Sequence, residues 1–152
     1  MIKKTLKAMS QFQDENDSPG FLLWRTHLVW KRKIEATLLK YDLTHIQFVL
    51  LTGLWFLTQN GELITQQTLS KFTYCDVNMT SQVLRVLEKK GWILRVRKEG
   101  DERGKYPTLT NEGSSILKKC LPKVEEVDQE FFGVLKKEQL PFQKHLKMLL
   151  GV

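Results

Sequence analysis

The segment from Thr65 to Thr110 constrains the fold more than any other part of the sequence. It begins with two short stretches of helical pattern, each preceded by a residue whose side chain can accept hydrogen bonds from the free N–H groups of a helix start. Thr65 can cap a helix to about residue 72, and Asp76 can cap a second one from about residue 77 to residue 90. Gly91 tolerates the positive φ of a helix C-terminus and closes the second helix. The pattern predicts a short helix, a tight turn and a second helix.

A β-hairpin is expected directly after these helices. Trp92–Arg97 ends by alternating apolar and basic residues, which is the period of a half-buried strand. The turn-rich Glu99–Gly104 separates it from Tyr106–Leu109, a second short strand. Helix, turn, helix and hairpin follow in the order of a winged helix-turn-helix, so the predicted fold class is mainly α with a small β-hairpin wing (α+β).

Helices are also expected on both sides of this segment. Apolar residues recur at helical spacing over about 21–40 and 45–58, and again over about 110–132 and 140–150. Thr44 and Gln47 match a capping box, and the helix that they open is apolar nearly all round, which predicts the buried centre of the fold. Pro122 should kink the helix over 110–132 or break it locally, whereas Pro141 fits the first turn of the helix over 140–150. Residues 11–20 are polar and end in turn residues, and residues 1–20 are interpreted as an N-terminal arm or linker.

The basic charge of the chain is concentrated near the hairpin. Of a formal net charge of +7, the stretch from Arg85 to Lys105 carries +4, since eight basic residues stand against four acidic ones. This footprint is typical of a polyanion-binding site, although charge alone fits a solvated basic face equally well.

Other functional classes are excluded by what the sequence lacks. No apolar run approaches the ~18 residues of a membrane-spanning helix, and no apolar stretch follows the basic N-terminus as in a secretory signal. Cys75 and Cys120 have no disulfide-framework spacing and suit free thiols in a reducing cytosol. We therefore expect a cytoplasmic, nucleoid-associated protein without membrane contact.

One face of the second helix of the pair is suited to reading bases. Thr80, Val83, Leu84 and Leu87 can face the core, which leaves an exposed stripe of Asn78, Ser81, Gln82 and Arg85. These side chains can pair with base edges, whereas a merely solvated face would more often carry Glu and Lys. Arg97, Lys98, Arg103 and Lys105 of the hairpin suit contacts with phosphates or with a narrow minor groove. The residues expected to contact DNA are Thr65, Gln67, Thr68, Asn78, Met79, Ser81, Gln82, Arg85, Lys89, Arg97, Arg103 and Lys105.

The sequence closely resembles the MarR family of bacterial transcriptional regulators. The matching motifs are LEKKGWILR (Leu87–Arg95), DER (Asp101–Arg103) and LTNEG (Leu109–Gly113), and LTHIQFVL (Leu43–Leu50) fits the entry into the family's second helix. The resemblance extends from about Phe21 to Leu150, and the combination of motifs is specific.

The resemblance implies a homodimer whose N- and C-terminal helices intertwine. Residues 21–42 and 111–152 would be dimerisation helices, with the interface near 21–28 and 131–150, and 43–110 would be the DNA-binding region. The recognition helix falls on Val77–Lys89, the wing arginine on Arg103, and Asp101 on the acidic partner that orients a basic side chain at the wing base. Pro107 departs from the pattern because it cannot donate a ladder hydrogen bond, so we expect a shorter or more open hairpin than is usual.

These features predict a sequence-specific transcriptional regulator of double-stranded DNA, acting as a homodimer on a pseudo-palindromic operator. Two recognition helices would enter successive major grooves, with half-sites ~10 bp apart. Bound near a promoter, such a protein usually represses by blocking polymerase. The alternative is a winged-helix module that binds protein and not DNA. An acidic or apolar recognition face would favour that alternative, and the polar stripe argues against it.

A small-molecule site and a redox site are each weighed against a structural role. Trp24, His27 and Trp30 either line the pocket in which relatives hold small aromatic effectors or belong to the core, as an aromatic helix face more often does. Cys75 is either a redox switch or a partly buried residue of the turn. The second interpretation is favoured, because the sensing cysteine of such relatives lies in the N-terminal helix. No metal site, catalytic group or cofactor is indicated, since the three histidines have no partners at ligand spacing and the chain shows no nucleophile–base arrangement.

Overall fold

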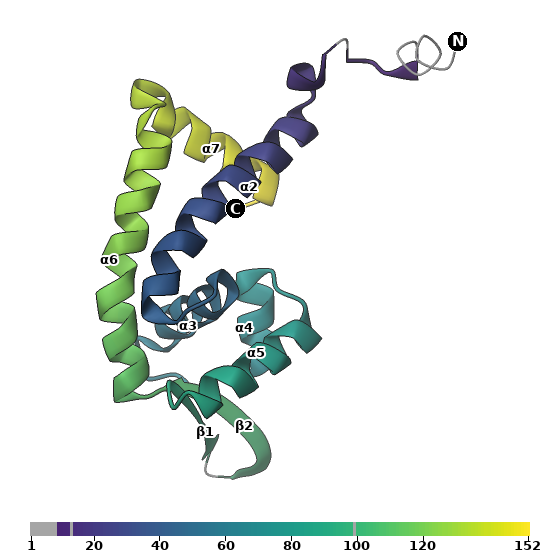
Figure 1. Cartoon of the computed structure of the whole chain (residues 1–152). Helices are drawn as coiled ribbons and strands as arrows, with labels where there is room; N and C mark the ends of the chain where they lie inside the picture. The colour runs from purple at the N-terminus through teal and green to yellow at the C-terminus, as the bar shows by residue number, and fades with distance from the viewer. Residues whose placement is uncertain (1–8, 13, 99) are drawn as a thin grey trace. The chain divides into compact units, whose positions relative to one another are not determined.

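The computed structural model describes residues 9–12, 14–98 and 100–152. The chain divides into two compact units, unit 1 (Met1–Lys33) and unit 2 (Ile34–Val152), which are described separately. In chain order the elements (Figure 1) are η1 (Glu15–Asp17), α2 (Pro19–Leu38), η2 (Leu39–Tyr41), α3 (His45–Thr58), α4 (Gln66–Thr73), α5 (Val77–Lys89), β1 (Ile93–Lys98), β2 (Asp101–Leu109), α6 (Asn111–Gly133), η3 (Lys136–Glu138) and α7 (Gln139–Leu150).

The described part of unit 1 consists of the 3-10 helix η1 and most of α2. Asp14 caps η1 by accepting a hydrogen bond from the backbone N–H of Asn16 at 2.7 Å. Apolar side chains on the part of α2 that belongs to unit 1 are largely exposed, with Leu23 at 56% and Trp24 at 59% of their full surface. The rings of His27 and Trp30 lie 6.0 Å apart between centroids. A helix with this much exposed apolar surface is typical of one that packs against a partner.

Helix α3 forms the centre of unit 2. The side chain of Thr44 accepts a hydrogen bond from the N–H of Gln47, and the Gln47 side chain accepts one from the N–H of Thr44, so the predicted capping box is confirmed. Leu50, Leu51 and Leu54 are fully buried. The helix contacts α4, α5, β2 and α6, which confirms that it is the centre of the core. Its C-terminal Trp55 and Phe56 nevertheless stay exposed.

A turn of three residues, Tyr74–Asp76, separates α4 from α5. Tyr74 takes the left-handed conformation with φ 55°, and Ser70 Oγ donates a hydrogen bond to the carbonyl oxygen of Cys75 at 2.7 Å. Asp76 accepts from the backbone N–H groups of Asn78 and Met79, each at 2.9 Å. Thr65 likewise caps α4, so both predicted caps are confirmed. These hydrogen bonds fix the start of α5 against the end of α4.

The hairpin is longer than the sequence pattern indicated. Strand β2 begins at Asp101, within the stretch expected to be a turn, and runs through Pro107, which lies opposite Arg95. Strand pairing therefore continues through Pro107, and the hairpin does not open at that residue.

The position of Pro107 in the hydrogen-bond ladder explains why the strand tolerates it. The N–H of Thr110 donates to the carbonyl oxygen of Trp92 at 3.1 Å, and Ile93 lies opposite Leu109. Bonded and non-bonded pairs alternate in an antiparallel ladder, so the pair of Arg95 with Pro107 is a non-bonded one. The nitrogen of Pro107 thus points away from β1, and its missing N–H costs no ladder bond.

Thr110 joins the hairpin to the helices on either side of it. Its Oγ1 donates to the carbonyl oxygen of Gly91 at 2.7 Å and accepts from the backbone N–H of Gly113 at 3.0 Å. Gly91, with φ 73°, ends α5 as predicted. The end of α5, the start of β1 and the first turn of α6 therefore meet at one residue.

The structure shows where the two prolines of the C-terminal helices, Pro122 and Pro141, lie. Helix α6 continues from Asn111 to Gly133 with Pro122 inside it, so the helix does not break there. Pro122 is exposed, and water can therefore serve the carbonyl group that its missing N–H leaves free. Pro141 lies in the first turn of α7, as predicted.

Candidate nucleic-acid interface

Helix α5 turns one face to the core and the other to solvent, as the sequence predicted. Thr80 and Leu87 are fully buried and Leu84 is 1% exposed, while Val83 is half-buried. The side chains of Asn78, Gln82 and Arg85 are exposed, and Ser81 is half-buried beside them. The predicted base-reading stripe therefore lies on the solvent side of the helix.

The other helical residues expected to contact DNA are also exposed. Met79 is 39% exposed near the start of α5, and Lys89 lies at its end. Thr65, Gln67 and Thr68 lie exposed at the start of α4. The hydroxyl of Thr65 is already engaged, since it accepts from the N–H of Thr68 at 3.1 Å and lies 3.0 Å from the Thr68 hydroxyl. Contact between these residues and DNA stays a prediction.

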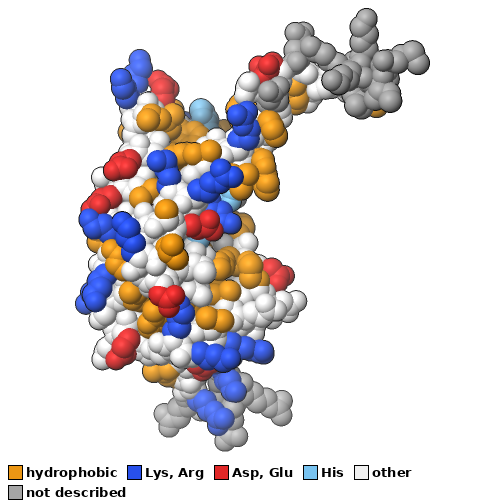
Figure 2. Space-filling model, viewed as in Figure 1, with side chains coloured by type: hydrophobic (Ala, Val, Ile, Leu, Met, Phe, Trp, Pro, Cys, Tyr) orange, Lys and Arg blue, Asp and Glu red, His pale blue; other side chains and the backbone are white. Residues whose placement is uncertain are grey.

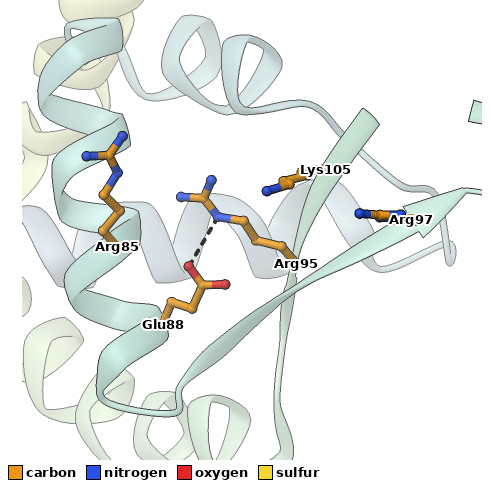
Figure 3. A pocket seen from close by; sticks show the side chains of 5 residues that line it. All are labelled: Arg85, Glu88, Arg95, Arg97 and Lys105. Atoms are coloured by element: carbon orange, nitrogen blue, oxygen red, sulfur yellow. Dashed lines mark ion pairs between the residues drawn. The ribbon is translucent and has the colours of Figure 1, made fainter. Parts of the chain in front are cut away.

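Helix α5 and the hairpin border an open pocket of about 440 Å³, called the basic pocket from here on. Figure 3 shows that its side chains come from α5 and from both strands, and that Arg95 extends toward Glu88 on the helix. Figure 2 shows Lys and Arg side chains gathered at the end of unit 2 that carries the hairpin. The residues that line the pocket are Arg85, Glu88, Arg95, Arg97 and Lys105. Four cations around one carboxylate favour an anionic ligand.

Two of the five pocket residues, Glu88 and Arg95, were not among the predicted site residues. Arg95 Nε lies 3.3 Å from Glu88 Oε2, and the two side chains are 22% and 43% exposed. The sequence did hold a signal for both. Glu88 follows Arg85 by three residues, which places the two on one face of a helix, and Arg95 shares a strand face with Arg97.

Arg103 and Asp101, the predicted wing arginine and its orienting acid, have a described backbone in β2. Their side chains, like that of Lys98, lie outside the part of the chain that the structure describes. Their predicted roles therefore stay predictions.

The two cysteines, Cys75 and Cys120, are both at least partly buried in the structure. Cys75 is half-buried in the turn before α5, where its thiol donates to the carbonyl oxygen of Thr73 at 3.5 Å. Cys120 is fully buried in α6, and desolvation raises the pKa of its thiol to about 11. A thiol with so high a pKa stays protonated near neutral pH and is a poor nucleophile.

Neither a metal site nor a membrane span is found in the part of the chain that the structure describes. Its histidine, cysteine, aspartate and glutamate side chains form no group of three or more that could hold a metal ion. Its helices are too short or too polar to cross a membrane.

Comparison with known proteins identifies relatives over most of the chain. Residues 32–120 match the family described as transcriptional regulator SarA/Rot. The uncharacterized HTH-type transcriptional regulator YdcH of Bacillus subtilis is 42% identical over 130 residues, which cover 86% of this chain and 88% of that protein.

Solved structures share the fold. The chain resembles S. aureus MepR in its complex with DNA, with a TM-score of 0.79, 25% identity, and coverage of 88% of this chain and 97% of that one. It also resembles the MarR family protein Rv2887 of Mycobacterium tuberculosis in its complex with salicylic acid, with a TM-score of 0.67, 25% identity, and coverage of 87% and 96%.

The matched proteins are transcriptional regulators and not enzymes, and the resemblance to the MarR family seen in the sequence is confirmed. The chain therefore belongs to the SarA/Rot family of MarR-like winged-helix transcriptional regulators.

Proposed function

We propose that this regulator is a homodimer that represses transcription by binding a pseudo-palindromic operator in double-stranded DNA. The observation that carries the proposal is the pairing of a polar stripe on α5 with the basic pocket beside it. Asn78, Gln82 and Arg85 can read base edges in the major groove. The pocket and the hairpin tip offer cations to the phosphates on either side.

The dimer is supported by apolar side chains that one chain leaves exposed near both ends. Phe21, Leu22, Leu23 and Trp24 lie on α2, and Leu140, Met148, Leu149 and Leu150 on α7; each is at least 41% exposed. Burial of such residues against a second copy would remove apolar surface from water. A two-fold dimer would present two recognition helices, and hence two half-sites ~10 bp apart.

An effector would act through the aromatic residues of α2. Trp24 is largely exposed, and His27 and Trp30 lie about one and two turns further along the same helix. An aromatic carboxylate of the salicylate class suits such a site, and Rv2887 is known in complex with salicylic acid. Binding there would release operator DNA by changing the spacing of the two recognition helices. The protein would then act in the cytoplasm, on the nucleoid.

The rival function, a winged-helix module that binds protein, has less support. A protein-binding recognition face would carry acidic or apolar side chains, and the face of α5 carries amides, a hydroxyl and an arginine. The centres of protein interfaces are also depleted of charged residues, whereas the basic pocket holds four cations, of which Arg95 is paired with Glu88.

A gel-shift and fluorescence-anisotropy experiment with the full-length protein tests the proposal. The probe is the DNA upstream of the protein's own gene, and the control is a scrambled duplex of equal length and composition. We expect tighter binding to the upstream probe, and an affinity that falls steeply with salt as phosphates release counterions. Equal, salt-independent binding to both duplexes would refute it. Isothermal calorimetry with salicylate tests the effector arm, and sedimentation equilibrium tests the dimer.

A further inference from the structure

We propose that Arg95, positioned by Glu88, binds a backbone phosphate of DNA at the junction of α5 and the hairpin. The phosphate would then tie the base-reading helix to the wing. This inference rests on the proposed function and names a contact within it. It concerns a residue of the strand root, well before the tip that carries Arg103.

The geometry places the Arg95 guanidinium where a phosphate could reach it. In Figure 3 it extends from β1 toward α5 and lies between Arg85 and Lys105. Arg95 is the less exposed partner of its ion pair, with 22% of its side-chain surface accessible. Its position is set by the root of the hairpin, where Ile93 is buried and Pro107 lies opposite Arg95 in the strand pair.

The hydrogen-bonding capacity of Arg95 is not met within the described residues. Its Nε and one terminal nitrogen are buried, and neither has a hydrogen-bond partner there. The carboxylate of Glu88 is close enough for an ion pair at 3.3 Å, but the N–H does not point at it well enough for a hydrogen bond. Buried, unpaired N–H groups on a charged side chain are unfavourable. These two nitrogens have almost no accessible surface, so an anion in the basic pocket would meet the accessible part of the Arg95 side chain first and would reach them only if the side chain shifts. The guanidinium fork then matches phosphate in particular.

The negative charge of Glu88 makes the inference testable. A carboxylate on a DNA-facing surface repels phosphates, so its removal alone should tighten DNA binding. If the main role of Glu88 is to hold Arg95 toward the pocket, removal should instead weaken binding. The two roles therefore predict opposite changes in affinity from one substitution.

The experiment compares full-length wild type with Arg95→Gln, Glu88→Gln and the double variant. The probe is the duplex that the wild type selects most strongly from a random pool, with anisotropy measured over a series of salt concentrations. Lys119→Gln is the matched control, since it removes one exposed positive charge from α6 outside the basic pocket. Circular dichroism and thermal unfolding establish that each variant is folded.

For Arg95→Gln we expect Kd to rise about tenfold and the slope of log K against log salt to become shallower by about one. Glu88→Gln should raise Kd severalfold, and the double variant should bind no worse than Arg95→Gln. Lys119→Gln should bind as the wild type does.

Three results would overturn the inference. They are tighter binding by Glu88→Gln, a salt slope for Arg95→Gln equal to that of Lys119→Gln, and additive losses in the double variant. If Arg95→Gln does not fold, Arg95→Lys replaces it. That variant should keep the salt slope but lose affinity severalfold, and an unchanged Kd would contradict a bidentate contact.

Two further outcomes have other meanings. One would show that the proposed function itself fails, and the other would show that the site binds free anions and not DNA. Should the wild type select no sequence from the pool, the proposed function fails and not merely this contact. A free-anion site would show thermal stabilisation of the wild type, and not of Arg95→Gln, by millimolar inorganic phosphate, with DNA affinity unchanged in the variant. That result would overturn the assignment to DNA.

Discussion

Gly113→Ala tests the packing that joins the hairpin to α6. A Cβ at this position would lie 2.0 Å from the carbonyl oxygen of Trp92 and 2.9 Å from its carbonyl carbon. Both atoms belong to the backbone at the root of β1, so the clash cannot be relieved by rotating a side chain. The first turn of α6 or the start of the hairpin must move.

The cost follows from the interactions that such a movement disturbs. Overpacking of this kind costs about 1–3 kcal/mol, and weakening the bond from the Gly113 N–H to Thr110 costs about 1 kcal/mol. The higher helix propensity of alanine offsets up to about 1 kcal/mol. We expect a net loss of about 2–3 kcal/mol, which for a chain of this length lowers Tm by roughly 5–10 °C.

The assay is thermal and urea unfolding followed by circular dichroism, at one protein concentration so that any dimerisation affects all variants equally. Gly133→Ala is the matched control, because it lies on the same helix and a Cβ there would meet no atom within 4 Å. It should be neutral or slightly stabilising. Equal stability of Gly113→Ala and Gly133→Ala would refute the packing argument.

Four further predictions concern the helix cap, the DNA contacts and the buried thiol. Asp76→Ala removes the acceptor of two hydrogen bonds at the start of α5 and should lower the free energy of unfolding by about 1 kcal/mol in urea titrations; an unchanged midpoint would contradict this. Arg85→Ala should cost about 1–3 kcal/mol of operator affinity and relax the preference at one base position, measured by binding to single-base operator variants. Arg103→Ala should instead weaken all duplexes to a similar extent, and a loss confined to one base position would show that it reads sequence. Because the folded state keeps Cys120 protonated up to about pH 11, whereas the unfolded thiol ionises from about pH 9, stability should fall as pH rises through this window; Cys120→Ala should lose that part of the pH dependence.

Local patterns in the sequence predicted most of the fold. The capping residues Thr44, Thr65, Asp76 and Thr110 each mark a helix start, because their side chains satisfy free N–H groups that every helix start presents. The burial of Thr80, Leu84 and Leu87 followed from helical spacing alone.

The errors came from features that depend on a second element. Whether Pro107 interrupts the hairpin depends on which ladder position it occupies, and that register is set by pairing with β1. Of the two outcomes expected at Pro122, the local break does not occur, since α6 continues through it. Trp55 and Phe56 continue the apolar pattern of α3 but stay exposed, because burial depends on what the neighbouring elements cover and not on the pattern alone.

Within the candidate site, the sequence indicated single residues better than pairs. The exposed stripe on α5 follows from one helix and was predicted correctly. The contact between Glu88 and Arg95 requires the angle between α5 and β1, which Gly91 and Thr110 set at the junction. The spacing of residues within one helix or strand cannot predict the angle between two elements.

Methylation interference on the selected duplex tests the central proposal most directly, because methylation at guanine N7 blocks the major-groove edge that a recognition helix would read. A homodimer with a recognition helix in each of two successive major grooves predicts interference at two clusters of guanines about 10 bp apart. Interference at one cluster only, or none in the presence of tight binding, would contradict it.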